Sequence, residues 1–267
     1  MHGIGNDFII IDAIRQAPKA PFDPSAVAKK KCQRHYGVGA DGLILALPSA
    51  VADARMRIFN ADGGEPEMCG NGIRCLGRFL YDEGIVTKNP MTIETLAGVL
   101  TLKMETRNGQ PMVTVNMGAP RLQPADIPVL APSNRVTLEL DGAPVHFFCV
   151  SMGNPHAVTF DLYPGDDRFH RLGAYLENHP LFPRKANVEF CRVRDGGVDV
   201  RVWERGDGET LACGTGACAV TVAGASLGLI PRSTEVRLPG GSLFIRWDEA
   251  GPVFMTGPAE TVYRGEW

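Results

Sequence analysis

The sequence carries little net charge. Its 267 residues include 27 Lys and Arg against 30 Asp and Glu, which gives a formal net charge of −3. A protein that binds nucleic acid or an anionic membrane surface normally needs a strongly basic face or segment. The near-neutral balance supports neither partner, so we expect a small-molecule substrate, no nucleic acid and no membrane.

The seven cysteines include no Cys-x-x-Cys pair. An odd number without that spacing is not the pattern of a disulfide framework, and His and Cys do not recur at the spacing of metal ligands. The chain starts with Met1-His-Gly-Ile-Gly-Asn-Asp7, which lacks the basic and apolar regions of a signal peptide. We therefore expect a reduced, cytoplasmic protein that holds no metal.

Only one uncharged stretch, residues 210–231, is long enough to span a bilayer. It is rich in Gly, Ala, Thr and Ser rather than Leu and Ile, and it opens with a glycine-rich turn. We interpret it as a helix buried inside a domain. The length of the chain favours about two domains, and 44% hydrophobic residues are sufficient for a core in each.

One motif occurs twice. The first copy runs from Arg57 to Arg74 and the second from Arg201 to Cys218. Adding 144 to a residue number relates the copies without a gap, so that it carries Arg57 to Arg201, Gly64 to Gly208, Glu65 to Glu209, Cys69 to Cys213, Gly70 to Gly214 and Gly72 to Gly216. Each copy predicts a strand, an acidic loop with glycines, and then Cys-Gly-x-Gly leading into a helix.

This order places Cys69 and Cys213 at helix N-termini. Unpaired backbone N–H groups and the positive end of the helix dipole hold an anion there and lower the pKa of a thiol. Asn71 and Thr215, rather than Asp or Glu, follow the Cys-Gly pairs, so no acidic side chain fills the anion position. The chain is thus predicted to build two matched sites, each with a thiol and an anion-binding helix end.

The remaining pattern is dominated by short strands. Further helices are predicted over 25–35, closed by Gly37, and over 168–179. Strands are predicted over 8–11, 43–47, 91–95, 100–106, 112–117, 136–140, 145–150, 188–193, 198–203, 234–238, 242–247 and 253–256. Asn108-Gly109 and Asp141-Gly142 are hairpin signals, 151–156 is a turn, and the proline-rich segment 118–134 separates the halves. The simplest architecture is a pseudo-twofold protein with a cleft between two similar halves, in which Glu65 and Glu209 stabilise the two loops.

Two equivalent thiols suggest proton transfer at a stereocentre. One sulfur takes a proton from carbon and the other delivers a proton to the opposite face, and the roles exchange in the reverse reaction. The two helix N-termini would hold the substrate carboxylate and stabilise the charge that spreads into it.

Eight ordered motifs resemble those of the diaminopimelate epimerase family nearly end to end. They are Met1-His-Gly-Ile-Gly-Asn-Asp-Phe8, Phe59-Asn-Ala-Asp-Gly63, Cys69-Gly-Asn-Gly-Ile-Arg-Cys75, Met152-Gly-Asn-Pro-His156, Glu177-Asn-His-Pro-Leu-Phe-Pro183, Asn187-Val-Glu-Phe190, Trp203-Glu-Arg-Gly206 and Ala212-Cys-Gly-Thr-Gly-Ala217. The resemblance implies an α/β (α+β) fold of two pseudo-symmetric domains, each a curved, mostly antiparallel sheet around a central helix. It implies a first domain of residues 1–116 and 257–267 and a second of residues 117–256.

The resemblance also implies cofactor-independent interconversion of LL- and meso-2,6-diaminopimelate in lysine biosynthesis, and a possible homodimer. By similarity, Cys69 and Cys213 are the catalytic pair, with Cys69 accepting the proton of the LL isomer, and His156 and Glu204 tune the thiols. The implied substrate-binding residues are Asn6, Asn60, Gly70, Asn71, Asn154, Asn187, Glu204, Arg205, Gly214 and Thr215. An Arg205 fork suits the distal carboxylate, and the amides and Glu204 suit ammonium groups.

Two positions depart from the family pattern. Where some members have a contacting glutamine, this chain has Gly42, so that contact is expected to be lost or made elsewhere. The chain also opens at Met1-His-Gly3, whereas relatives usually carry a few earlier residues that complete the first strand. The length of that strand, not the chemistry, is affected.

Other interpretations remain open from the residues. Taken singly, each cysteine would be a buried structural residue, as we expect for Cys32, Cys75, Cys149, Cys191 and Cys218. Histidines other than His156 are expected to be structural or exposed. A related proline or hydroxyproline racemase, or a phenazine-pathway isomerase, would share the fold but would not need Arg205 as a second anion clamp. A dithiol redox protein and a plain binding module are alternatives from other classes.

Overall fold

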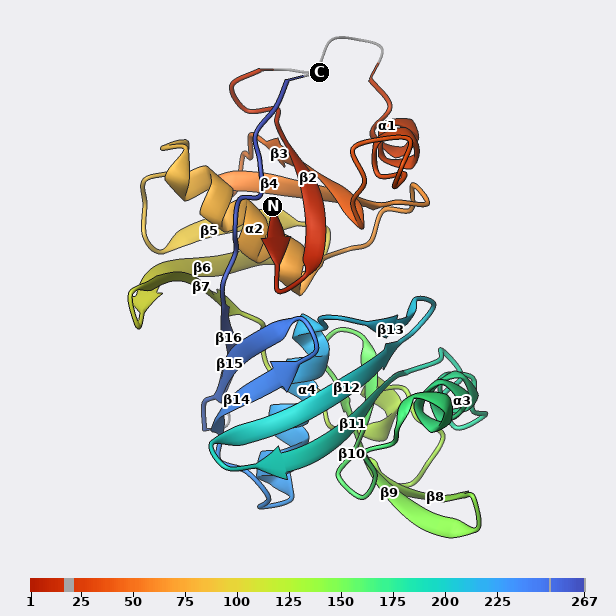
Figure 1. Ribbon diagram of the computed structural model, residues 1–267. Coiled ribbons are helices and arrows are strands. Elements are labelled where there is room, and N and C mark those ends of the chain that lie inside the picture. The colour runs from red at the N-terminus through yellow and green to blue at the C-terminus, as the bar shows by residue number, and fades with distance from the viewer. Residues whose placement is uncertain (17–21, 250, 267) are drawn as a thin grey trace. The chain divides into compact units, whose positions relative to one another are not determined.

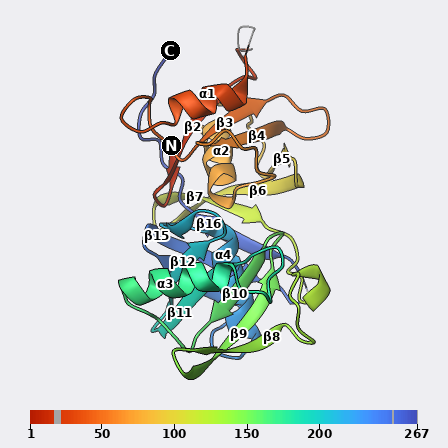
Figure 2. The ribbon, with the colours of Figure 1, turned by 90° about the vertical axis from the view of Figure 1, so that its right-hand side faces the viewer.

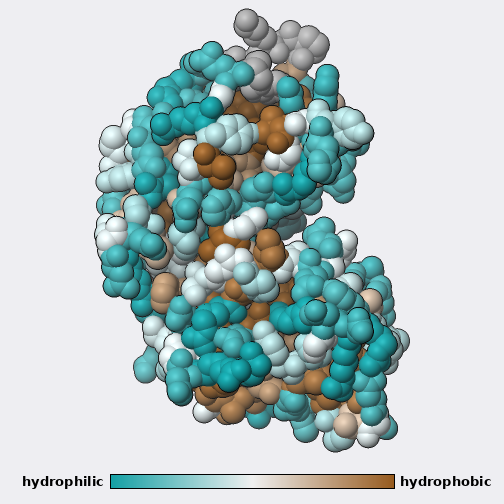
Figure 3. All heavy atoms as spheres, in the orientation of Figure 1, coloured by the Kyte–Doolittle hydropathy of each residue, from teal (hydrophilic) through white to brown (hydrophobic). Residues whose placement is uncertain are grey.

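The computed structural model describes residues 1–16, 22–249 and 251–266, and the chain divides into two compact units. Unit 1 contains Met1–Asn116 together with the C-terminal segment from Thr256 onward, and unit 2 contains Met117–Met255. Each unit combines a curved sheet with two helices (Figure 1). Hydrophilic side chains cover most of the face of each unit seen in Figure 3.

In unit 1 the strands lie side by side in chain order from β1 to β7. Its elements are β1 (His2–Gly3), β2 (Asn6–Asp12), α1 (Pro24–Lys31), β3 (Gly42–Leu47), β4 (Ala54–Asn60), α2 (Gly70–Asp82), β5 (Met91–Thr95), β6 (Gly98–Arg107) and β7 (Gln110–Asn116). The pairs β2–β3 and β4–β5 are parallel and the others are antiparallel. The helices α1 and α2 lie in the two crossovers between the parallel partners, as such connections require.

In unit 2 the strand order is β15-β14-β12-β11-β10-β9-β8, with β13 beside β12. Its elements are the 3₁₀ helix η1 (Pro124–Asp126), β8 (Arg135–Leu140), β9 (Ala143–Ser151), β10 (Pro155–Thr159), α3 (Asp166–Glu177), β11 (Asn187–Arg194), β12 (Gly197–Glu204), β13 (Gly208–Thr210), α4 (Gly214–Ser226), β14 (Ser233–Leu238) and β15 (Gly241–Trp247). The parallel pairs are β10–β11 and β12–β14. The last strand, β16 (Val253–Gly257), contains the point where the chain passes from unit 2 back to unit 1.

The two units share one connectivity. In each, the first crossover carries an outer helix, α1 or α3, and the second carries a central helix, α2 or α4, which contacts strands along much of its sheet. The outer helix α3 packs on β11 and β12, and α1 packs on β3 and β4 (Figure 2). The predicted fold class, two curved and mostly antiparallel sheets around central helices, is confirmed.

Both central helices have 13 residues and are buried for most of their length. In α2, Ile73, Leu76 and Leu80 are fully buried, and α4 is enclosed on nearly all sides, which suits its small uncharged side chains. The uncharged stretch 210–231 is therefore a buried helix with its flanking turns, as predicted. Among the residues described, no helix combines the length and apolar character needed to cross a membrane.

Local turn chemistry sets both predicted hairpins. Asn108 and Gly109 have φ of 51° and 77°, and Asp141 and Gly142 have φ of 53° and 77°. Two successive positive φ values match the twist of a two-residue hairpin, and Asn-Gly and Asp-Gly tolerate them with little strain.

Several predicted boundaries were wrong. The first helix ends at Lys31, not His35, because Cys32 is its C-cap and packs with Ala28 against the sheet, while His35 has a φ of 74°. The third helix runs from Asp166 to Glu177, not from 168 to 179. The segment 151–156 was interpreted as a turn, but its last two residues already belong to the buried strand β10. This strand begins at Pro155, and a proline is tolerated at the first position of a strand.

Two very short strands, β1 and β13, were not predicted as separate elements. The strand β1 has only two residues, and His2 forms an isolated bridge with Glu260.

Candidate active site

An ion pair braces the loop of each repeat. Arg57 Nε and Nη2 donate to Glu65 Oε1 and Oε2 at 2.7 and 2.8 Å, and Arg201 Nη2 donates to Glu209 Oε1 at 2.6 Å. These pairs occupy equivalent positions in the two copies of the motif. The prediction that both glutamates stabilise their loops is confirmed.

Cys69 is the N-cap of α2. Its backbone is extended, with φ of −135° and ψ of 122°, and its sulfur accepts the backbone N–H of Gly72 at 3.4 Å. No acidic residue occupies the first turn, and Gly70 and Asn71 are buried there. The predicted position of this cysteine at the start of a helix is confirmed.

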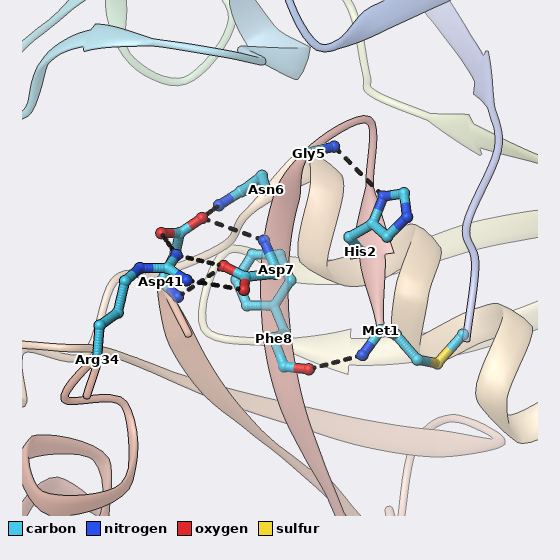
Figure 4. Close-up of polar contacts among 8 residues, drawn as sticks. All are labelled: Met1, His2, Gly5, Asn6, Asp7, Phe8, Arg34 and Asp41. Carbon is cyan, nitrogen blue, oxygen red and sulfur yellow. Dashed lines mark hydrogen bonds and ion pairs between the residues drawn. The ribbon is translucent and has the colours of Figure 1, made fainter. Parts of the chain in front are cut away.

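Asn6 joins Cys69 to Asn71. Its Oδ1 lies 3.8 Å from the sulfur and accepts Asn71 Nδ2 at 3.1 Å, while its Nδ2 donates to Asp41 Oδ2 at 2.7 Å. Figure 4 shows that Asp41 also holds the turn through the Asp7 backbone N–H, and that Arg34 bridges the carboxylates of Asp7 and Asp41. Asp41 and Arg34 were not predicted, because only the fold brings them beside Asn6.

Asn60 and Gly42 lie opposite one another where β4 and β3 pair. Asn60 is exposed at the end of β4. A Cβ atom at position 42 would lie 2.8 Å from the carbonyl oxygen of Phe59 and 3.3 Å from the Phe8 ring. This backbone therefore accommodates glycine rather than a longer residue, and position 42 provides no side-chain contact.

Cys213 is the N-cap of α4 and is 3% exposed. Its thiol donates to Glu204 Oε2 at 3.2 Å and lies 3.6 Å from Thr215 Oγ1. The other oxygen of Glu204 accepts the Thr210 hydroxyl at 2.6 Å. In unit 2 the thiol thus faces a carboxylate, whereas Cys69 faces an amide.

Asn154, His156 and Asn187 form a network of contacts that reaches Thr215, the neighbour of the Cys213 thiol. Asn154 Nδ2 donates to Thr215 Oγ1 at 3.3 Å, and His156 Nε2 lies 3.0 Å from Asn154 Oδ1. Asn187 Oδ1 accepts the backbone N–H of Arg205 at 2.8 Å. The parallel pairing of β10 with β11 places Asn187 next to His156.

The Arg205 side chain is exposed, and its Nη1 donates to the carbonyl oxygen of Arg184 at 3.0 Å. Gly214 forms the first position of α4, beside Cys213. Among the residues that the structure describes, no three His, Cys, Asp or Glu side chains gather in a way that could hold a metal ion.

Comparison with known proteins identifies the family. The family model described as diaminopimelate epimerase matches residues 1–123 and 148–262. The chain is 52% identical over 271 residues to a protein named diaminopimelate epimerase from Desulfitobacterium hafniense, which covers 99% of this chain and 95% of that protein. The chain belongs to the diaminopimelate epimerase family.

Two further matches agree with this assignment. A protein of the same name from Desulforudis audaxviator is 52% identical over 272 residues, covering 100% of this chain and 97% of that protein. A crystal structure of a hydroxyproline epimerase from Agrobacterium vitis is similar with a TM-score of 0.65 and 19% identity, covering 96% of this chain and 87% of that one. At that identity, the second match shows the shared fold of these epimerases alone.

In this member of the diaminopimelate epimerase family, the predicted lowering of the thiol pKa is wrong for Cys213. Burial, followed by the charges of Glu204 and Glu189, raises the pKa of the Cys213 thiol well above its ordinary value. The helix N-terminus favours the thiolate, but loss of solvent and two nearby carboxylates outweigh it. Burial also raises the pKa of Glu204, despite the hydrogen bonds that it accepts.

Glu189 was missed in the sequence. It lies in the middle of β11, is fully buried, and its Oε1 is 2.6 Å from His156 Nδ1. The signal was available, because a strand that is otherwise apolar between Val188 and Cys191 contains one acidic residue. A carboxylate at such a position needs a partner.

We predict that Glu204→Gln increases the alkylation rate of Cys213. The Glu204 carboxylate raises the pKa of this thiol, so removing its charge lowers that pKa and increases the thiolate fraction at a given pH. Iodoacetamide labelling between about pH 7 and 9, with each cysteine followed by peptide mass spectrometry, measures the change against the ordinary thiol pKa of about 8.5. Cys69 in the same molecules is the internal control. An unchanged or slower labelling of Cys213 would show that Glu204 does not set its protonation.

Proposed function

We propose that this chain interconverts LL- and meso-2,6-diaminopimelate without a cofactor, by proton transfer between two thiols and one α-carbon. The observation that carries this proposal is the duplicated helix start: Cys69 and Cys213 are the N-caps of two equivalent helices, and neither first turn contains an acidic residue. A single nucleophilic cysteine would not require the second copy.

In the forward direction, the Cys69 thiolate removes the α-proton of the LL isomer, so that the C–H bond breaks and an S–H bond forms. The electron pair spreads into the α-carboxylate. The Cys213 thiol then gives its proton to the opposite face of the carbon, which leaves a Cys213 thiolate. The reverse reaction exchanges the two roles.

The backbone N–H groups at Gly70-Asn71 and Gly214-Thr215 bind the reacting carboxylate. Both lie in first helical turns, where N–H groups have no intrahelical partner and the helix dipole favours negative charge. Because charge develops on the carboxylate as the proton leaves, these donors stabilise the transition state more than the substrate.

The other predicted residues recognise the substrate. Asn6, Asn60, Asn154 and Asn187 offer amides and Glu204 offers a carboxylate for the ammonium groups, and Arg205 binds the distal carboxylate as a planar fork. His156 and Glu204 tune the protonation of Cys213, since Glu204 contacts the thiol and His156 reaches it through Asn154 and Thr215.

Domains of residues 1–116 with 257–267 and of residues 117–256 serve as the two halves of the enzyme, one thiol in each. The enzyme acts in the cytoplasm, in lysine biosynthesis, as a homodimer; these three inferences rest on the family assignment. The small net charge supports a small-molecule substrate without nucleic acid or membrane partners.

The decisive assay follows deuterium at the α-carbon. The wild-type protein, with its thiols reduced, is expected to convert LL-diaminopimelate in deuterium oxide into product that carries α-deuterium. We expect Cys69→Ser or Cys213→Ser to slow deuterium incorporation about 10²- to 10⁴-fold, because a hydroxyl is a far weaker acid than a thiol. Cys32→Ala, which changes a core cysteine at the C-terminus of α1, is the matched control and keeps the wild-type rate.

Absence of label with the wild-type protein would exclude epimerase chemistry and favour a binding module. Normal turnover in either serine variant would exclude the two-thiol mechanism, and reversible sulfur–sulfur bonding without any isomerisation would favour the redox alternative.

Arg205 separates this substrate from a monocarboxylic amino acid. We expect Arg205→Gln to raise KM for diaminopimelate about 10- to 100-fold with a smaller change in kcat, because a charge-assisted contact to the remote carboxylate is lost. Arg184→Gln is the matched control, since only the backbone carbonyl of Arg184 contacts Arg205. Steady-state kinetics with both variants, and with proline as a competing substrate, make the measurement. An unchanged KM, or turnover of proline, would favour the racemase alternative.

A further inference from the structure

The two units differ at two buried positions beneath their central helices. In unit 2 these positions hold His156 and Glu189, both fully buried. The equivalent positions in unit 1 hold Phe8 and Ile44, which are also buried. A histidine–glutamate pair thus occurs in one half where the other half has two apolar side chains.

Strand register establishes this equivalence. Phe8 pairs with Gly42 in the parallel ladder of β2 and β3, and His156 pairs with Asn187 in the parallel ladder of β10 and β11. Ile44 and Glu189 each follow two residues after these partners, on the same face of their strands.

The glycines of the repeated motif confirm the match. A Cβ atom at Gly72 would lie 3.0 Å from Ile44 Cδ1, and one at Gly216 would lie 2.8 Å from Glu189 Oε1. Each side chain therefore lies directly under the first turn of its central helix. The fold itself does not need a buried polar pair at this place, because unit 1 has apolar side chains at the same site.

A chain of polar contacts leads from Glu189 to Cys213. Glu189 Oε1 is 2.6 Å from His156 Nδ1, and His156 Nε2 is 3.0 Å from Asn154 Oδ1. Asn154 Nδ2 then donates to Thr215 Oγ1 at 3.3 Å, and that hydroxyl lies 3.6 Å from the Cys213 sulfur. Each imidazole nitrogen thus faces an oxygen atom, and Asn187 Nδ2 also lies 3.5 Å from His156 Nδ1.

Several charges surround this chain. The Glu189 carboxylate lies by the N-terminus of α4, whose dipole favours negative charge. Its Oε2 is buried and makes no hydrogen bond with any described residue. The other titratable groups that face the cluster are Glu204 and Cys213, with the buried Cys149 and Cys191 beside Glu189.

We propose that Glu189 is a positioning residue that keeps a proton on both nitrogens of His156. The Nε2–H group of His156 then donates to Asn154 Oδ1 and fixes the orientation of the Asn154 amide. In that orientation, Asn154 Nδ2 points at Thr215 in the first turn of the helix that Cys213 caps. The imidazolium and the carboxylate compensate one another's burial. A neutral His156 with Nε2 unprotonated would instead favour the flipped amide, which would direct an oxygen at Thr215. This role deepens the proposed function and rests on it for its effect on turnover.

The proton count on His156 tests the proposal without reference to activity. In the nitrogen-15-labelled full-length protein at about pH 7.5, where an ordinary histidine is mainly neutral, we expect both His156 ring nitrogens to show the chemical shifts of protonated imidazolium nitrogens. The His156→Gln spectrum assigns the signals. In Glu189→Gln one ring nitrogen is expected to lose its proton. A wild-type His156 with an unprotonated nitrogen, or a Glu189→Gln spectrum identical to the wild type, would overturn the proposal.

Turnover supplies the second readout. We expect Glu189→Gln to slow α-deuterium incorporation about 10- to 100-fold, the range of a lost charge-assisted hydrogen bond. Glu94→Gln is the matched control, because this partly buried carboxylate contacts only Ser49 and Arg55 in the described part of unit 1, and it keeps the wild-type rate. Wild-type turnover in Glu189→Gln would overturn the proposal.

A double variant separates packing from charge. His156→Phe combined with Glu189→Ile gives unit 2 the side chains that unit 1 has at these positions, so we expect a folded protein that incorporates deuterium no faster than Glu189→Gln. Full turnover in the folded double variant would overturn the proposal. A wild-type protein that shows the doubly protonated histidine but incorporates no deuterium would defeat the proposed function and leave the assignment of Glu189 and His156 intact.

Discussion

The start of a central helix is the feature on which each unit depends. The first N–H groups of a helix have no intrahelical partner, so a buried helix start must be capped or must receive a ligand. In α2 and α4 a cysteine occupies the cap and the first turn lacks acidic side chains. The curved sheet encloses the rest of the helix, and the ion pairs Arg57–Glu65 and Arg201–Glu209 hold the loop that leads into it. The fold thus places a thiol at the first turn of a buried helix twice.

Duplication has preserved the scaffold and varied the charges. Cys69 lies near the amides of Asn6 and Asn71, and the apolar Ile44 lies under the first turn of its helix. Cys213 contacts Glu204, and the buried Glu189 and His156 lie under the first turn of its helix. Such a difference costs stability, because a buried ion pair rarely contributes more than hydrocarbon packing of similar volume. Stability therefore does not account for the polar pair in unit 2, and the proposed positioning role offers a reason for it.

Sequence patterns predicted most of the elements and the candidate site residues, but not the contacts that connect those residues. Hairpins at Asn-Gly and Asp-Gly, the strand alternation and the helix after each Cys-Gly-x-Gly depend on local chemistry, and they were found. The end of α1, the strand β10 and the partners of Asn6 depend on contacts between distant segments. Glu189 was overlooked because the alternating pattern of a strand predicts which side chains are buried. The pattern does not reveal that the partner of this buried carboxylate is His156, on the neighbouring strand.

The raised pKa of Cys213 agrees with the proposed chemistry. Two thiols that both ionised readily would leave no acid, and two that both stayed protonated would leave no base. Burial and two carboxylates favour the protonated form of Cys213, which suits the proposed role of this thiol as the proton donor. An amide, that of Asn6, contacts the Cys69 thiol, whereas a carboxylate contacts the Cys213 thiol. Matched backbones with different side-chain contacts thus agree with the proposed reaction, in which Cys213 is the acid in the forward direction.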